Sequence, residues 1–142
     1  MNMKSLFFLV TLFICAMTDI VTFRIKNVIL VLSAAALLFM DLLIYTDGDP
    51  LSDITSGAAV LLLLIPFYIL GLLGAGDVKL LALTAMYAGL LSMCRIAAAS
   101  TVVSLIIVSV MSISRHEKMI KIKYPFAFAL LMGALPFWFD RF

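Results

Sequence analysis

The feature that most constrains this chain is a succession of long apolar runs, separated by short polar, charged or glycine-rich stretches. Of the 142 residues, 65% are hydrophobic and only 13% are charged. Soluble globular proteins contain roughly 45–50% apolar and about 25% charged residues. A soluble fold of this size cannot bury so much apolar surface, whereas a lipid bilayer accepts it exposed. The sequence therefore predicts an integral membrane protein.

Six apolar runs approach the roughly 20 residues that a helical membrane span needs. They cover Ser5–Thr22, Val28–Tyr45, Thr55–Leu73, Val78–Met93, Ile96–Ile113 and Tyr124–Phe139. Backbone polar groups in lipid must be satisfied internally, and the alternating pattern of a membrane β-barrel is absent. We therefore predict an all-α, polytopic membrane protein, with a bundle of about six transmembrane helices in one domain over residues 1–142.

The charges of the predicted connections indicate an orientation. Basic residues gather in the first, third and fifth connections, and the largest group lies between residues 114 and 123. By the positive-inside rule these connections are cytoplasmic, and both termini are outside. Lys4 opposes this assignment weakly. We expect a tight turn at Cys94–Arg95 and a solvated acidic loop over residues 46–54.

Several functional classes are disfavoured by composition. The net charge is only +2, and no basic patch suits nucleic acid. The two cysteines form no CxxC pair, the chain has one histidine, and the acidic loop lacks the spacing of an EF-hand. We therefore expect no metal site and no cofactor.

Two acidic residues interrupt the apolar pattern at the same predicted membrane depth. Asp19 lies near the end of the first span, and Asp77 lies at the start of the fourth. A carboxylate at the edge of the hydrocarbon is costly and indicates function. If the two helices pack together, one carboxyl can keep its proton while the other activates a water, as in aspartic proteases.

Each acidic residue also has a purely structural interpretation. Asp77 alone could be a helix N-cap, and the positive helix end would favour its charged form. Asp19 alone could pair with Arg24 or Lys26 at the membrane surface. These two basic residues are most simply interfacial anchors, and Asn27 is most simply the N-cap of the second span.

Two glycines immediately precede Asp77, in the sequence Gly74-Ala75-Gly76-Asp77. Glycine accepts positive φ angles and allows another chain to approach closely. An extended substrate could therefore lie against this segment.

Three segments resemble the signatures of type IV prepilin peptidases, in the order found in that family. Asp19-x-x-x-x-Arg24-Ile25-x-Asn27 resembles the first signature. Gly74-x-Gly76-Asp77-x-Lys79-Leu80 resembles the second, the GxGD motif, which presenilin-like proteases also carry. The segment that begins Tyr124-Pro125-Phe126 resembles the third, although Ala127 stands where the family often has glycine.

The resemblance implies a membrane aspartyl endopeptidase with Asp19 and Asp77 as its catalytic pair. Such hydrolases remove the short, basic leader of type IV prepilins or pseudopilins, which have a hydrophobic stem, at the cytoplasmic face of the inner membrane. The implied systems are type IV pili and protein secretion. Further residues are expected to bind substrate or to shape the site: Gly74, Gly76, Lys79, Arg24, Asn27 and Pro125.

Larger relatives carry a methyltransferase region with paired CxxC motifs, which this sequence does not show. The chain therefore resembles the short form that serves tight-adherence (Flp) pili, or an archaeal preflagellin peptidase. The alternative class is a non-catalytic membrane protein, either a small transporter or an assembly subunit of a pilus or secretion machine. A homo-oligomer remains open.

Overall fold

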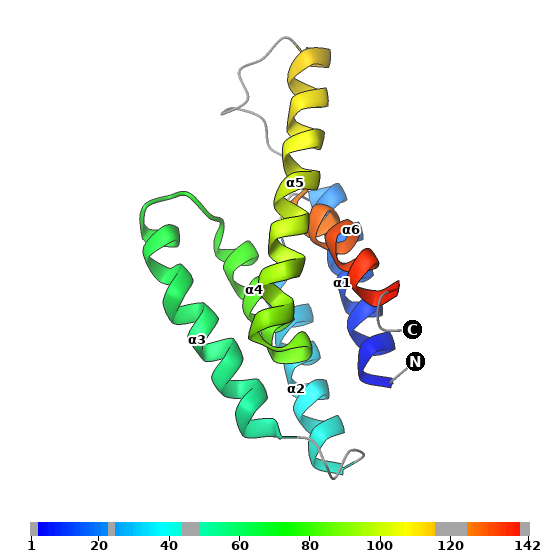
Figure 1. Ribbon diagram of the computed structural model, residues 1–142, viewed down its shortest axis with the longest axis vertical. Helices are drawn as coiled ribbons and strands as arrows, with labels where there is room; N and C mark the ends of the chain where they lie inside the picture. The colour runs from blue at the N-terminus through cyan, green and yellow to red at the C-terminus, as the bar shows by residue number, and fades with distance from the viewer. Residues whose placement is uncertain (1–2, 23–24, 44–48, 116–124, 140–142) are drawn as a thin grey trace.

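The computed structural model describes residues 3–22, 25–43, 49–115 and 125–139, and within these ranges it forms helices and no strand. Figure 1 shows the six helices, which pack as an elongated bundle. Their bounds are α1 Met3–Thr22, α2 Asn27–Leu43, α3 Pro50–Ile69, α4 Ala75–Ala88, α5 Leu90–Arg115 and α6 Phe126–Phe139. The predicted all-α class and the six predicted helices are confirmed.

The helix boundaries follow local sequence chemistry. Asp49 caps α3, because its Oδ1 accepts the Ser52 backbone N–H at 3.3 Å, and Pro50 occupies the first helical position. Past the end of α3 the chain turns at Gly71, whose φ of 72° suits glycine. The helix α6 begins directly after Pro125. Short polar and glycine-containing segments thus divide the apolar sequence into helices.

The predicted turn at Cys94–Arg95 is wrong. The break between α4 and α5 lies at Gly89, which adopts a φ of 79° and donates its N–H to the Ala85 carbonyl at 2.9 Å. Arg95 was interpreted as a loop residue because of its charge, but it is an exposed residue within α5. Backbone freedom, rather than polarity, therefore decides where α4 stops.

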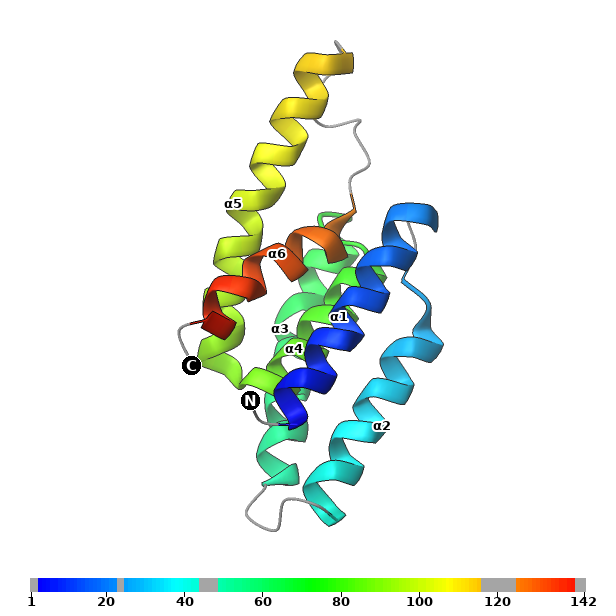
Figure 2. The same ribbon diagram turned by 90° about the vertical axis from the view of Figure 1, so that its right-hand side faces the viewer.

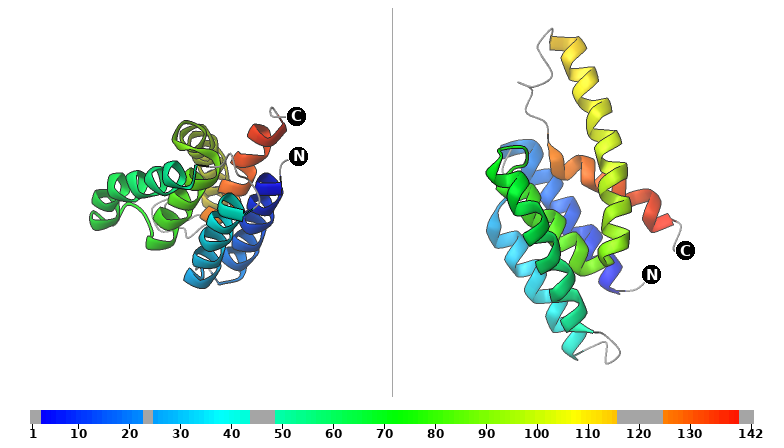
Figure 3. Two further views of the ribbon diagram at one scale, coloured as in Figure 1. Left: turned by 90° about the horizontal axis from the view of Figure 1, so that it is seen from below. Right: turned by 60° about the vertical axis from the view of Figure 1, so that its left-hand side comes forward.

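The helix α4 lies at the centre of the bundle and contacts each of the other five helices. Figures 2 and 3 show these helices arranged around it. Its side chains are buried without interruption from Leu80 to Ala85. A helix that is apolar and buried on every side belongs to the interior of a bundle. The site residues at the N-terminal end of α4 are consequently held by several elements at once.

The outer helices expose large apolar side chains. Within the described residues, three segments are long and apolar enough to cross a membrane: Lys4–Thr22, Pro50–Ile69 and Leu90–Ser112. Only 11% of the α3 segment is buried inside the protein. Such a surface would be unstable in water but suits the hydrocarbon of a bilayer. The chain is a membrane protein.

The helices α5 and α6 approach closely at Gly133 and Ser100. A Cβ atom added to Gly133 would lie 2.6 Å from the Ser100 backbone nitrogen, which no real side chain tolerates. Small residues at such crossings are typical of helix pairs in membranes. This contact fixes α6 against α5 and so helps to place the α6 N-terminus.

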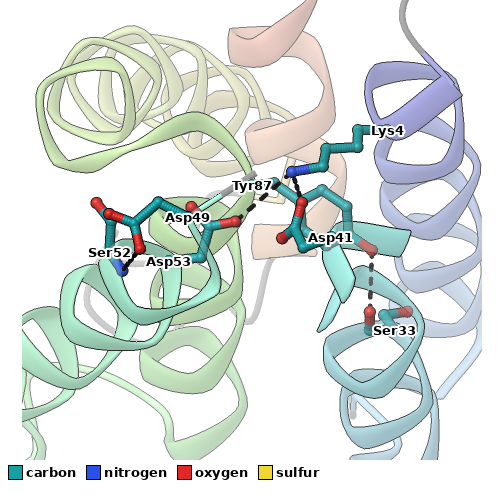
Figure 4. Close-up of polar contacts among 7 residues, drawn as sticks. All are labelled: Lys4, Ser33, Asp41, Asp49, Ser52, Asp53 and Tyr87. Atoms are coloured by element: carbon teal, nitrogen blue, oxygen red, sulfur yellow. Dashed lines mark hydrogen bonds and ion pairs between the residues drawn. The ribbon is translucent and has the colours of Figure 1, made fainter. Parts of the chain in front are cut away.

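A cluster of charges joins three helices at the end of the bundle that holds the α2–α3 connection (Figure 4). Lys4 of α1 forms an ion pair with Asp41 of α2 and lies 3.8 Å from the Asp53 carboxylate of α3. The Asp41 side chain is completely buried, whereas those of Lys4 and Asp53 are each 24% exposed. Asp41 does not stand out in the sequence, because it lies within the apolar run from Val28 to Tyr45.

Candidate active site

Asp19 lies one turn before the end of α1 and is only 6% exposed. Its Oδ2 accepts the backbone N–H of Ala127 at 2.9 Å. Ala127 is the second residue of α6, where backbone N–H groups have no partner within the helix. The carboxylate therefore meets the positive end of α6, which favours its ionised form.

Asp77 lies in the first turn of α4 and is half-buried. It is not the N-cap that the sequence suggested, because α4 begins at Ala75 and Gly74 takes the N-cap position. The Asp77 Oδ2 accepts the Gly74 backbone N–H at 3.3 Å, as the third helical residue of a capping box does. The acid still stabilises the start of α4, but from the third position of the helix.

The fold brings the two acids together, although 58 residues separate Asp19 from Asp77 in the sequence. The carboxylates lie close enough for the charge of Asp19 to act on Asp77. Each one accepts an N–H at the N-terminal end of a helix: Asp19 from Ala127 in the first turn of α6, and Asp77 from Gly74, the N-cap of α4. Helix dipoles therefore favour charge at both positions, and not only at Asp77.

The two glycines of the motif act by leaving space rather than through positive φ. Gly74 has an ordinary φ of −73°, and a Cβ there would lie 2.9 Å from the Asp77 Oδ2. A Cβ at Gly76 would lie 3.3 Å from the Ile25 Cβ. The close approach is therefore made by this chain's own α1–α2 connection, and Gly74 keeps room for the carboxylate.

The first and second motifs are joined by a hydrogen bond between Lys79 and Asn27. The Lys79 Nζ donates to the Asn27 Oδ1 at 3.0 Å. Asn27 is the first residue of α2, and its side-chain oxygen serves this contact with α4 rather than the N-cap role that the sequence suggested. The contact ties the start of α2 to the first turns of α4.

Of the other residues predicted to shape the site, the structure describes Pro125 but not Arg24. Pro125 directly precedes α6, and its carbonyl accepts the Ala129 N–H at 3.4 Å. Ala127 was not predicted to contact Asp19, because it acts through its backbone N–H and not its side chain. The start of α6 after Pro125 was the available signal, because a helix N-terminus is a ready partner for a carboxylate.

No group of three or more His, Cys, Asp or Glu side chains suited to a metal ion occurs among the residues that the structure describes. Two carboxyls that influence one another can differ in protonation, which is the requirement for acid–base hydrolysis.

The fold and the site define an all-helical membrane protein with a pair of interacting carboxylates near one end of its bundle. The chain belongs to the type IV leader peptidase family, whose family model matches residues 6–113. It is accordingly a peptidase of that family, as the sequence resemblance predicted. The match includes both acids but ends before Pro125 and Ala127. No curated protein and no solved structure matches the chain.

Proposed function

We propose that this protein is an aspartyl endopeptidase of the inner membrane that removes the short, basic leader of type IV prepilins or pseudopilins at the cytoplasmic face. The observation that carries the proposal is the pairing of Asp19 with Asp77 in a member of a leader peptidase family. Membership supplies the reaction class, and the carboxylate pair supplies groups able to perform it.

In the proposed mechanism, the pair shares one proton. The ionised carboxyl takes a proton from a water, and the resulting hydroxide attacks the scissile carbonyl carbon. The protonated carboxyl donates to the carbonyl oxygen as negative charge develops there. The Ala127 and Gly74 N–H groups hold the two carboxyls in position through the reaction, because each bonds one carboxylate oxygen.

The proposed topology is multi-pass, with the first, third and fifth connections in the cytoplasm. The end of α1, the start of α4 and the start of α6 lie at one end of the bundle (Figure 2). A substrate whose hydrophobic stem lies in the bilayer would present the base of its leader at that depth. Cysteine-accessibility labelling at Lys121, after replacement of Cys15 and Cys94, tests this orientation, and labelling from the periplasm would contradict it.

The decisive experiment compares Asp19→Asn and Asp77→Asn with Asp53→Asn, an acid outside the pair. Each protein is purified in detergent and incubated with a prepilin, and cleavage is followed by gel shift. Asparagine keeps an oxygen that can accept the Ala127 or Gly74 N–H but cannot exchange a proton at pH 7. We expect both variants of the pair to lose cleavage and Asp53→Asn to retain it.

The same experiment separates the peptidase from a transporter or assembly subunit. In those classes neither substitution changes any peptide bond, and the prepilin stays uncleaved even with the wild-type protein. Cleavage at near wild-type rate by both Asn variants would refute the proposed mechanism.

A further inference from the structure

A groove of about 250 Å³ lies between α2, α3 and α4, away from the carboxylate pair. The residues that line it include Asn27, Val31, Ala34, Leu61, Lys79 and Ala82. Figures 1 and 2 show that α2 and α3 diverge, and that they lie farthest apart at the end of the bundle where α2 begins. The helix α4 forms the floor between these two diverging walls.

The groove is apolar along its length and cationic at one end. Among the residues that the structure describes, Asn27 and Lys79 are the only polar ones that line it, and none of the lining residues is acidic. The Lys79 ammonium has three N–H donors. Among the described residues, the hydrogen bond to Asn27 is the one polar contact that we find for it. An exposed positive charge with donors to spare therefore stands at the mouth of an apolar groove.

This groove is separate from the carboxylate pair. Lys79 follows Asp77 by two residues, and two residues turn an α-helix by about 200°. The two side chains consequently project from opposite sides of α4, Asp77 toward Asp19 and Lys79 toward α2. A ligand in the groove would contact the same helix as the catalytic acid without entering the site.

We propose that this groove binds an anionic phospholipid, with an acyl chain along α4 and the phosphate against the Lys79 ammonium. The groove opens to the bilayer, since Val31 is 66% exposed and Leu61 is 38% exposed on its two walls. A phospholipid supplies both an apolar chain and an adjacent negative charge. Basic pockets between membrane helices bind anionic lipid headgroups in this way.

The charge at the mouth decides between the possible occupants. The basic leader of the proposed substrate would be repelled by Lys79, and an uncharged chain would leave the spare ammonium donors unused. An anionic phospholipid satisfies both features of the groove. The lipid proposal does not depend on the peptidase activity, because it concerns the other side of α4.

Native mass spectrometry of the detergent-purified full chain, titrated with phosphatidylglycerol or phosphatidylcholine of identical acyl chains, tests the proposal. We expect wild-type protein to favour phosphatidylglycerol by about fivefold, since one lysine near a headgroup contributes about 1 kcal/mol. In Lys79→Gln the preference should fall to nearly none, because glutamine can still donate to Asn27 but carries no charge. Lys26→Gln is the matched control, since Lys26 is exposed near the same end but does not line the groove.

Filling the groove should abolish binding of both lipids. Ala34→Phe does so from the α2 wall, and Leu61→Trp does so from the α3 wall if the first variant fails to fold. Equal binding of the two lipids by wild type, or equal effects of Lys79→Gln and Lys26→Gln, would overturn the proposal. A photo-crosslinker at Leu61 can also be offered a lipid and a synthetic apolar helix long enough to cross the bilayer once. Capture of the helix and not of the lipid would overturn the proposal.

Discussion

Replacing Lys4 with methionine should destabilise the fold more than removing either carboxylate that it contacts. The Lys4 ammonium forms an ion pair with Asp41, whose side chain is completely buried. Breaking a buried ion pair by removing one member costs about 3–5 kcal/mol, because an uncompensated charge stays buried. The 24% exposure of Lys4 indicates partial access to solvent, so we expect about 3 kcal/mol for Lys4→Met.

Removing the other member of the pair, Asp41, should cost less. In Asp41→Leu the remaining ammonium is partly exposed and still lies 3.8 Å from Asp53, so its charge stays compensated. The double variant Lys4→Met/Asp41→Leu removes both charges and should therefore be more stable than Lys4→Met alone, within about 1 kcal/mol of wild type. Asp53→Asn serves as the control for a longer, partly exposed contact and should cost less than about 1 kcal/mol.

The measurement is reversible unfolding in mixed micelles, with the helical circular dichroism signal followed as SDS increases. The wild type, Lys4→Met, Asp41→Leu and the double variant form a double-mutant cycle, which isolates the coupling between Lys4 and Asp41. If Lys4→Met/Asp41→Leu is less stable than Lys4→Met, the buried charge is not the source of the loss, and the reasoning fails.

Four further outcomes are expected. Ala127→Pro removes the N–H that Asp19 accepts, and cleavage should fall about 10- to 100-fold, whereas Ala127→Gly keeps that N–H and should cleave normally. Gly74→Ala places a Cβ 2.9 Å from the Asp77 Oδ2 and should lower the cleavage rate about 10- to 100-fold with little change in unfolding free energy. Gly133→Ala forces α6 away from the α5 backbone and should cost about 1–3 kcal/mol in the SDS unfolding assay. EDTA should leave the cleavage rate unchanged, and a loss that zinc restores would contradict the two-carboxylate mechanism.

Hydropathy was sufficient to predict the class of fold and the number of helices. Each span is a local property, since a run of apolar residues forms a helix in lipid whatever its neighbours are. Boundaries were less predictable. The turn at Gly89 carries one glycine and no charge, whereas Arg95 suggested a loop but lies on the exposed side of a continuous helix.

The site was predictable only where side chains carry its chemistry. Asp19 and Asp77 stand out as acids at the ends of apolar runs, and the structure brings them together. The Ala127 N–H could not be found in the same way, because every residue except proline has that donor. Its role depends on how α6 crosses α1, which no local pattern encodes. The buried partner of Lys4 was hidden for a similar reason, since only packing decides whether an acid within a span is paired.

The central position of α4 has a consequence for how the protein enters the membrane. Its 14 residues extend about 21 Å, at 1.5 Å per residue, against a hydrocarbon thickness of about 30 Å. Unlike α1, α3 and α5, it is not among the segments long and apolar enough to cross a bilayer. During synthesis, α4 should therefore integrate only together with its neighbours. Placed as the sole apolar segment between two soluble reporter domains, α4 should leave the fusion extractable by alkaline carbonate, whereas α3 in the same place should anchor it.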